Sequence, residues 1–434
     1  MQMAGLMLLS LIRHRVMLPV LLLLSACSEM PEHLAPTGHA ITAPSNLNTS
    51  FQQYLDDTRT QLELALTQVY QRTGGSPFGD HYPLDVVVQM RAPFEIPVSA
   101  ECAADAPRTG YLLVHGLTDS PYLLSAMARA FAEQSPCVLV RSLLLPGHGT
   151  SPGDALEVHR DEWRQVVRFG VNSFKGEVDE LYLVGYSAGA AILAEYADQN
   201  RNNAQLAGLL LMSPALGLPD PLTWLSPYAR WFISWMGAEQ ERDAAKYETL
   251  PINAGAELYK LIQEMNWPKM QTLDIPVMMV VSGADNTVDV NAAEQFFCEK
   301  APVDRRRLIW FQAADGSHRS QLNCSGTVEQ SAVDSELRTV SVSHVGLTLP
   351  ASDPHYGRDA AYRQCLHYRQ SPERLQQCLT DDAQTVYGER SLLVEGLFEG
   401  RVLRRATFNP HFASMMEEIG CFLADQCEPN RQKN

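Results

Sequence analysis

Short apolar runs alternate along the chain with longer segments whose apolar residues recur every three or four positions. A nearly continuous apolar run is typical of a strand buried on both faces, whereas the longer spacing indicates an amphipathic helix. The predicted strands cover 84–90, 111–116, 137–145, 180–186, 206–213 and 275–283. The predicted helices cover 51–72, 122–134, 161–174, 188–200, 290–300 and 410–423. This alternation predicts an α/β fold, with a mostly parallel sheet covered by helices on both faces.

The alternation is interrupted between about residues 214 and 273, which supply no apolar strand. Aromatic residues recur there at helical spacing: Trp224, Tyr228, Trp231, Phe232 and Trp235. We therefore expect a helical cap over the carboxyl edge of the sheet. Its aromatic side chains either bury the cap against the main domain or face a ligand.

The amino-terminal segment has the layout of an export signal. Residues 1–26 contain two arginines and then a short apolar run, which ends at Cys27 in the sequence LSAC. This ending resembles the bacterial lipoprotein box, which implies cleavage before Cys27 and a lipid anchor on that cysteine. Ser28 then indicates the outer membrane, facing the periplasm. An ordinary secretory leader is the alternative. Residues 27–50 are polar and Pro-rich, which predicts a tether to a folded domain over 51–434.

Eight cysteines remain after Cys27 is set aside, and an even number in an exported chain predicts disulfides. Neighbours in the sequence suggest the pairs 102–137, 298–324, 365–378 and 421–427. No Cys/His cluster has the spacing of a metal site, so none is expected. Without the leader the chain carries 32 basic and 50 acidic side chains, a net charge of −18, which argues against nucleic acid as a partner.

Candidate chemistry centres on Gly185-Tyr186-Ser187-Ala188-Gly189, which fits the pattern G-x-S-x-G. A strand is predicted before it and a helix after it, as this motif requires. The tight turn strains the backbone at the serine, so only small flanking residues leave room for it. The helix that begins at Ala188 directs its N–H groups toward developing negative charge. Ser187 is therefore the predicted nucleophile.

With this motif, the chain resembles the α/β-hydrolase family over roughly residues 84–345, and specifically its monoacylglycerol lipase and carboxylesterase branch. The motifs that carry the resemblance are His115-Gly116-Leu117-Thr118, LPGHGTSPGD (145–154), the Ser187 turn, KYETLP (246–251) and SGADNTVD (282–289). The resemblance implies that the backbone N–H groups of Leu117 and Ala188 form an oxyanion hole, and that no cofactor is needed. His115 and His148 are expected to pack and hydrogen-bond within their loops.

The resemblance also implies an acid at the carboxyl end of the strand predicted over 275–283, where Asp285 lies. Asp289 is better suited to capping the following helix, and Asp274 lies at the wrong end of the strand. Asp220, after the preceding strand, is a weaker alternative.

The base follows the acid in this fold, which leaves two main candidates, His318 and His344. His318 lies 33 residues after Asp285, near the usual family spacing. His344 lies 59 residues after it, at the end of a β-branched stretch that also predicts a strand. The sequence around His344 resembles exported members of the family, so His344 is the preferred base. The remaining downstream histidines are expected to be surface or packing residues: His355, His367 and His411.

These observations predict a lipid-anchored serine hydrolase that cleaves carboxylic esters, such as monoacylglycerols or lysophospholipids, through an acyl-enzyme formed by Ser187, His344 and Asp285. A serine peptidase or amidase is the alternative, because the same triad serves both reactions. A non-catalytic envelope binding protein is a third possibility. Residues 355–434 form a predicted disulfide-containing extension to which the sequence assigns no function.

Overall fold

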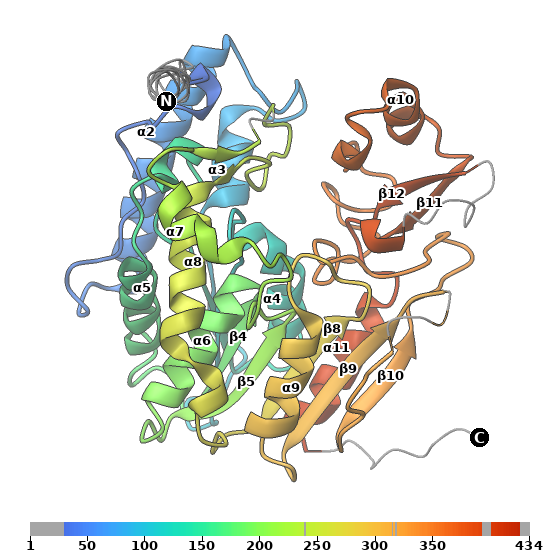
Figure 1. The fold of residues 1–434 in the computed structure, drawn as a ribbon. Coiled ribbons are helices and arrows are strands. Elements are labelled where there is room, and N and C mark those ends of the chain that lie inside the picture. The colour runs from blue at the N-terminus through green and yellow to red at the C-terminus, as the bar shows by residue number, and fades with distance from the viewer. Residues whose placement is uncertain (1–29, 238–239, 315, 317–318, 393–400, 426–434) are drawn as a thin grey trace, which may run out of the picture.

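The computed structural model describes residues 30–425 except 238–239, 315, 317–318 and 393–400. Its centre is an eight-stranded sheet in the order β1-β3-β2-β4-β5-β8-β9-β10, in which only β1 runs antiparallel to its neighbour (Figure 1). The strands are β1 (Glu95–Ile96), β2 (Thr109–Val114), β3 (Val138–Leu143), β4 (Glu180–Tyr186), β5 (Leu206–Met212), β8 (Val277–Ser282), β9 (Arg306–Gln312) and β10 (Thr327–Ser331). The predicted parallel α/β sheet is confirmed, and it also includes β1, β9 and β10, which lie outside the strand ranges predicted above.

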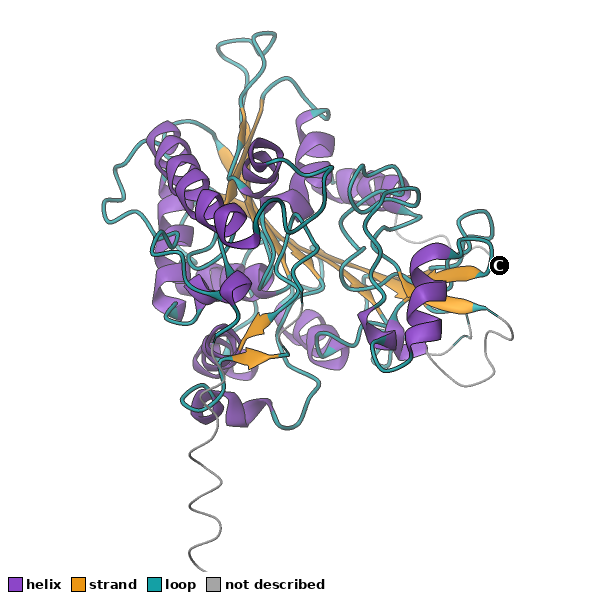
Figure 2. Cartoon of the chain, turned by 90° about the horizontal axis from the view of Figure 1, so that it is seen from above, coloured by secondary structure: helices purple, strands orange, loops and turns teal. Residues whose placement is uncertain are grey.

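Helices cover both faces of this sheet, as Figure 2 shows from above. One face packs against α5 (Arg160–Asn172), α6 (Ala188–Gln199), α8 (Ile252–Met265) and α9 (Val290–Lys300). The other packs against α4 (Ser125–Ala132) and α11 (Phe412–Leu423). Short 3-10 helices join these elements: η1 (Glu32–Leu34), η2 (Pro121–Leu124), η3 (Pro152–Ala155), η4 (Thr223–Leu225), η5 (Trp267–Lys269), η6 (Leu366–Tyr368) and η7 (Arg390–Leu392). Within the described residues, no helix combines the length and the apolarity needed to cross a membrane.

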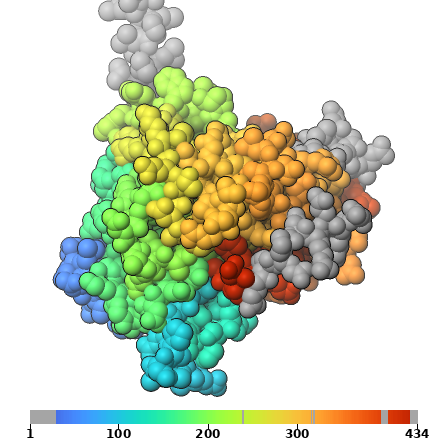
Figure 3. Space-filling view, turned by 90° about the horizontal axis from the view of Figure 1, so that it is seen from below, coloured from blue at the N-terminus to red at the C-terminus, as the bar shows by residue number. Residues whose placement is uncertain are grey.

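The amino-terminal part of the described chain packs on the domain. The long helix α2 (Phe51–Thr73) forms where its apolar spacing predicted it and buries one face. Leu34 and Thr37, within the predicted tether, are buried, and Thr37 donates from its N–H and its hydroxyl to Asp154. The space-filling view from below (Figure 3) shows the blue residues of this region and the orange residues around 300–330 on opposite sides.

The strand predicted over 84–90 is wrong, because these residues form helix α3 (Leu84–Arg91). Pro83 occupies the N-cap, where its fixed φ and missing N–H are tolerated. Val87, Val88 and Arg91 fall on one buried face, and the Arg91 guanidinium donates to carbonyls of two separate loops, including that of Ala244 at 2.7 Å. Tertiary packing of this face therefore overrides the strand preference of the valines.

Among the described residues, the predicted cap region contains the short helices η4 and α7 (Ser226–Ala229) ahead of α8, and a small antiparallel pair of β6 (Trp235–Met236) and β7 (Leu250–Pro251). Four of the five aromatic residues that predicted the cap are exposed, and the fifth, Trp235, is half-buried. Trp224, Tyr228, Trp231 and Phe232 are exposed, Phe232 by 86%. Most of the aromatic side chains that were expected either to bury the cap or to face a ligand therefore face solvent.

The carboxyl-terminal extension adds a second small sheet, in which β11 (Thr385–Gly388) and β12 (Val402–Arg405) pair in parallel, and the helix α10 (Pro372–Thr380). Figure 1 shows these elements together at the upper right, apart from the main sheet. The strand predicted before His344 is wrong, because residues 340–349 form no strand. Helix α11 follows these elements and packs against the main sheet.

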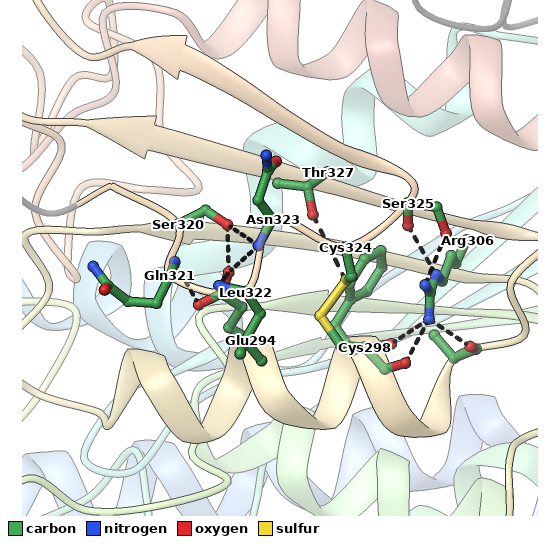
Figure 4. The surroundings of a disulfide bond; sticks show 12 residues. Glu294, Cys298, Arg306, Ser320, Gln321, Leu322, Asn323, Cys324, Ser325 and Thr327 are labelled. Carbon is green, nitrogen blue, oxygen red and sulfur yellow. Dashed lines mark hydrogen bonds between the residues drawn. A yellow bond between two sulfur atoms is a disulfide. The ribbon is translucent and has the colours of Figure 1, made fainter.

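Three of the four predicted disulfides are confirmed: Cys102–Cys137, Cys298–Cys324 and Cys365–Cys378. The fourth includes Cys427, outside the described residues. Figure 4 shows how Cys298–Cys324 ties α9 to the loop that follows β9. The buried Glu294 of α9 accepts hydrogen bonds from this loop, among them the N–H groups of Gln321 and Leu322. The loop is therefore attached to the helix by covalent and polar contacts together.

Candidate active site

Ser187 lies on a strained turn between β4 and α6, as its motif predicted. Its φ of 55° and ψ of −118° are unfavourable for a residue with a side chain. A Cβ added to Gly189 would lie 2.2 Å from the Val114 carbonyl oxygen, and one added to Gly185 would lie 2.4 Å from Ala190 Cα. The two glycines are therefore required for close packing of the turn, which raises the serine hydroxyl above the ends of the strands.

Ser187 and Asp285 both hydrogen-bond to His344. His344 Nε2 lies 3.1 Å from Ser187 Oγ, and His344 Nδ1 lies 2.5 Å from Asp285 Oδ2. An ionised carboxylate only accepts, so Nδ1 carries the proton and Nε2 is left to accept from the serine hydroxyl. All three residues are largely buried. The structure thus joins the three predicted residues in one chain of hydrogen bonds.

Asp285 is held as an anion by its surroundings. Burial by itself would raise the pKa of its carboxyl, but the charge of His344 and the hydrogen bond from it lower that pKa below its usual range. The Thr287 N–H donates to the other carboxylate oxygen at 2.8 Å, and the charge of Arg405 acts in the same direction. Asp285 can therefore keep the His344 ring in one tautomer and orientation.

The loop that carries His344 is held by hydrogen bonds to the backbone N–H and to the backbone carbonyl of His344. The His344 N–H donates to Glu389 Oε2 at 3.1 Å, and its carbonyl accepts from the Tyr186 hydroxyl at 3.0 Å. Glu389 is fully buried and forms an ion pair with Arg405 at 2.8 Å. Sequence reasoning missed Glu389 and Arg405, because both lie in the extension and nothing in their local sequence indicates proximity to His344.

The predicted oxyanion residues flank Ser187. Ala188 is the first residue of α6, where helix geometry leaves N–H groups without a partner inside the helix. Leu117 lines the same cavity as Ser187. Thr118 has a left-handed φ of 68°, and its carbonyl accepts from the Tyr247 N–H of the cap region at 2.8 Å. This contact connects the cap to the loop that contains Leu117.

The remaining candidates have structural contacts. His115 and His148 are buried and bond to the Gly116 and Pro146 carbonyls, and burial lowers the pKa of both rings. Asp289 caps α9 by accepting from the Asn291 and Ala292 N–H groups. Asp220 accepts from the Leu222 N–H instead of from a histidine. The alternative base His318 and the predicted lipidation residue Cys27 lie outside the described residues.

A cavity of about 480 Å³ opens over Ser187 and His344. Apolar side chains of the cap region line one part of it: Leu218, Met236, Leu250, Ile252 and Leu258. Polar side chains of the carboxyl-terminal extension line another: Gln364, His367, Arg390 and Arg405. No group of three or more potential metal-ligating side chains occurs among the described residues. The cap also contributes polar side chains, among them Lys246 and Glu248. The site therefore offers a serine, a histidine and a carboxylate beside a cavity with aliphatic and polar lining from the cap and polar lining from the extension.

The chain is similar in sequence to a known hydrolase family and to one of its lipases. The sequence model of the alpha/beta hydrolase family matches residues 111–328. A thermostable monoacylglycerol lipase from Bacillus sp. (strain H-257) is 23% identical over 193 residues, which are 43% of this chain and 75% of that protein. Among solved structures, a monoacylglycerol lipase from Paleococcus ferrophilus is 18% identical, with a TM-score of 0.39 over 51% of this chain and 88% of its own. A soluble variant of monoglyceride lipase from Saccharomyces cerevisiae is 15% identical, with a TM-score of 0.42 over 55% of this chain and 85% of its own.

Proposed function

The chain belongs to the alpha/beta hydrolase family, and we propose that it is a serine hydrolase that cleaves carboxylic esters through an acyl-enzyme. The observation that carries this proposal is the chain of hydrogen bonds from Ser187 through His344 to Asp285, at the floor of a cavity. Similarity to a monoacylglycerol lipase supports the esterase class. Neither a metal nor a cofactor takes part in the proposed reaction.

In this proposal each residue has one role. His344 Nε2 takes the proton of the Ser187 hydroxyl while the serine oxygen attacks the ester carbonyl. His344 then donates this proton to the departing alcohol. Asp285 stabilises the imidazolium. The N–H groups of Leu117 and Ala188 donate to the oxyanion, and in comparable sites one such donor contributes about 3 kcal/mol to lowering the barrier. Water, activated by the same histidine, then releases the acid.

The aliphatic part of the cavity lining supports esters with an apolar acyl chain. The cap side is lined by aliphatic side chains such as Leu250 and Leu258, against which an acyl chain would be removed from water. Monoacylglycerols and lysophospholipids are therefore the proposed substrates. A serine peptidase or amidase would use the same triad, but the apolar wall favours an acyl chain over a peptide.

We also propose that the protein is anchored through a lipid on Cys27 in the outer membrane, facing the periplasm. The leader and its LSAC box support this location. The exposed apolar side chains of the cap, including Trp231 and Phe232, would suit a protein that works beside lipid. The anchor is tested by expressing the wild-type protein and Cys27→Ala with their leader and comparing the amount of each in the membrane fraction. Cys27→Ala should leave the membrane fraction, and its retention there would contradict the proposal.

The decisive test of the catalytic residues is labelling with a fluorophosphonate probe together with hydrolysis of p-nitrophenyl butyrate. Ser187→Ala should abolish both, and His344→Ala should reduce both at least a thousandfold, whereas the exposed His81→Ala should match wild type. Circular dichroism establishes that each variant is folded. Labelling that survives in Ser187→Ala would refute the nucleophile, and labelling without any ester hydrolysis would favour the amidase alternative.

A further inference from the structure

The carboxyl-terminal extension supplies a polar wall to the cavity over Ser187. Gln364 precedes η6, His367 lies within it, Arg390 begins η7 and Arg405 ends β12. All four follow residue 328, where the match to the family ends. Figure 1 shows α7 and α8 of the cap to the left of β8 and β9, and β11 and β12 to their upper right. The aliphatic lining thus comes from the cap, which also contributes polar side chains such as Lys246 and Glu248, and the extension adds a separate polar wall.

Most charges around this cavity already have partners. Arg405 pairs with Glu389 through Nε at 2.8 Å and Nη2 at 2.9 Å. Lys246 pairs with Asp119 at 2.9 Å. The cap carboxylate Glu248 accepts from the Tyr362 hydroxyl at 2.9 Å. Each of these charged groups is already satisfied by a protein partner, so it is less available to bind a ligand.

Arg390 differs from them, because no carboxylate among the described residues forms an ion pair with its guanidinium. Its Nε donates to Asn286 Oδ1 at 3.1 Å, which places the side chain beside the residue that follows Asp285. Burial and the nearby charge of Arg405 lower the pKa of Arg390. An anion in the cavity would offset both effects, and the two Nη groups are suited to bind a phosphate or carboxylate in a bidentate manner.

Two hydrogen-bond acceptors lie on the same wall. The Gln364 Oε1 atom is buried and has no hydrogen-bond partner among the described residues. His367 Nε2 donates to the Leu403 carbonyl at 2.9 Å, so the neutral ring retains a lone pair on Nδ1. Burial lowers the pKa of His367, which favours this neutral form. Hydroxyl groups of a ligand would satisfy such acceptors.

We propose that this wall is a subsite for an anionic head group. Arg390 binds the phosphate, and Gln364 and His367 accept from the one free hydroxyl of a monoacyl glycerophosphate and from the second hydroxyl that cleavage of its ester releases. This inference rests on the proposed function, because it assigns the acyl chain to the cap wall and the alcohol part of the ester to the extension. It distinguishes phosphate-bearing substrates from neutral monoacylglycerols. Arg390 is a binding residue in this scheme and takes no part in proton transfer.

Binding tests the subsite without depending on catalysis. Isothermal titration calorimetry of the mature chain would compare glycerol 3-phosphate, inorganic phosphate and glycerol. Glycerol 3-phosphate should bind, glycerol should not, and Arg390→Gln should weaken the binding about tenfold to a hundredfold, with Arg390→Lys in between. The exposed Arg59→Gln, which removes the same charge from α2, should bind as wild type does. Absence of binding to wild type, or equal binding by Arg390→Gln, would overturn the subsite.

Two further arms separate the possible explanations. Equal affinity for inorganic phosphate and glycerol 3-phosphate would overturn the roles given to Gln364 and His367. The ratio of kcat/KM for 1-decanoylglycerol 3-phosphate to that for 1-decanoylglycerol, below their aggregation limits, should fall at least tenfold in Arg390→Gln. An unchanged ratio would refute the substrate assignment. Failure of the proposed esterase function would instead appear as loss of activity on both esters, with glycerol 3-phosphate binding retained.

Discussion

We expect the buried ion pair between Glu389 and Arg405 to support both stability and activity, because it connects the carboxyl-terminal extension to the loop of His344. Glu389 is fully buried, and its carboxylate accepts from the His344 N–H at 3.1 Å, from the Arg390 N–H at 2.8 Å and from the Arg405 guanidinium. Glu389→Gln keeps the shape of the side chain and one acceptor oxygen, but removes the negative charge. Arg405 is then left as a buried cation without its ion-pair partner, and the charge of Asp285 still acts on it.

The expected loss of stability follows from that unpaired charge. Removal of one partner of a buried pair costs about 3–5 kcal/mol, whereas an exposed pair contributes less than about 1 kcal/mol. Glu389→Gln should therefore lower the free energy of unfolding by about 3 kcal/mol. The control is Glu63→Gln, which breaks the exposed ion pair with Arg59 on α2. This variant should change the free energy of unfolding by less than about 1 kcal/mol. Because the His344 loop loses support, kcat should also fall about tenfold to a hundredfold.

Stability is measured by urea unfolding monitored through tryptophan fluorescence, and activity is measured by hydrolysis of p-nitrophenyl butyrate. Glu389→Leu, Arg405→Met and the double variant with both substitutions complete a cycle, in which the double variant should be more stable than the sum of the single effects predicts. An unfolding free energy of Glu389→Gln equal to that of wild type would refute the reasoning. So would additive effects in the cycle, since they would show that the two side chains do not interact.

Three other predictions concern the site and its frame. Asp285→Asn should lower kcat about a thousandfold or more, because an amide directs the wrong tautomer at the histidine, and steady-state kinetics with folding checked by circular dichroism would measure it. Burial raises the pKa of Glu241 to about 7 from 4.5, so the folded state holds this proton more tightly and stability falls as pH rises between these values. The loss amounts to about 3 kcal/mol, and Glu241→Gln should abolish it in urea titrations at pH 5 and pH 8; the same pH response in both proteins would contradict the assignment. Replacing Cys298 and Cys324 by serine should lower stability by about 3.5 kcal/mol for a sequence separation of 26, and a loss below 1 kcal/mol would show that the contacts of Glu294 suffice without the disulfide.

The sequence by itself determined the α/β core and the Ser187 turn. Both depend on local patterns: apolar runs bounded by helical spacing, and small residues where a Cβ would collide with the backbone of β2. The same locality explains the confirmed disulfides, whose partners are near neighbours along the chain. It also explains the error over 84–90, because a run of valines predicts a strand unless the packing of Arg91 is known.

Only the tertiary structure decided what surrounds the serine. His344 reaches Ser187 from a loop, not from the strand its sequence predicted, and it is oriented by Glu389, 45 residues further along. Arg390 and Gln364 join the cavity from the extension, to which the sequence assigned no function. Buried ion pairs and cavity walls depend on contacts between distant segments, and such contacts leave no periodic pattern in the chain. The hydrophobic pattern specifies the sheet, and long-range packing specifies the site.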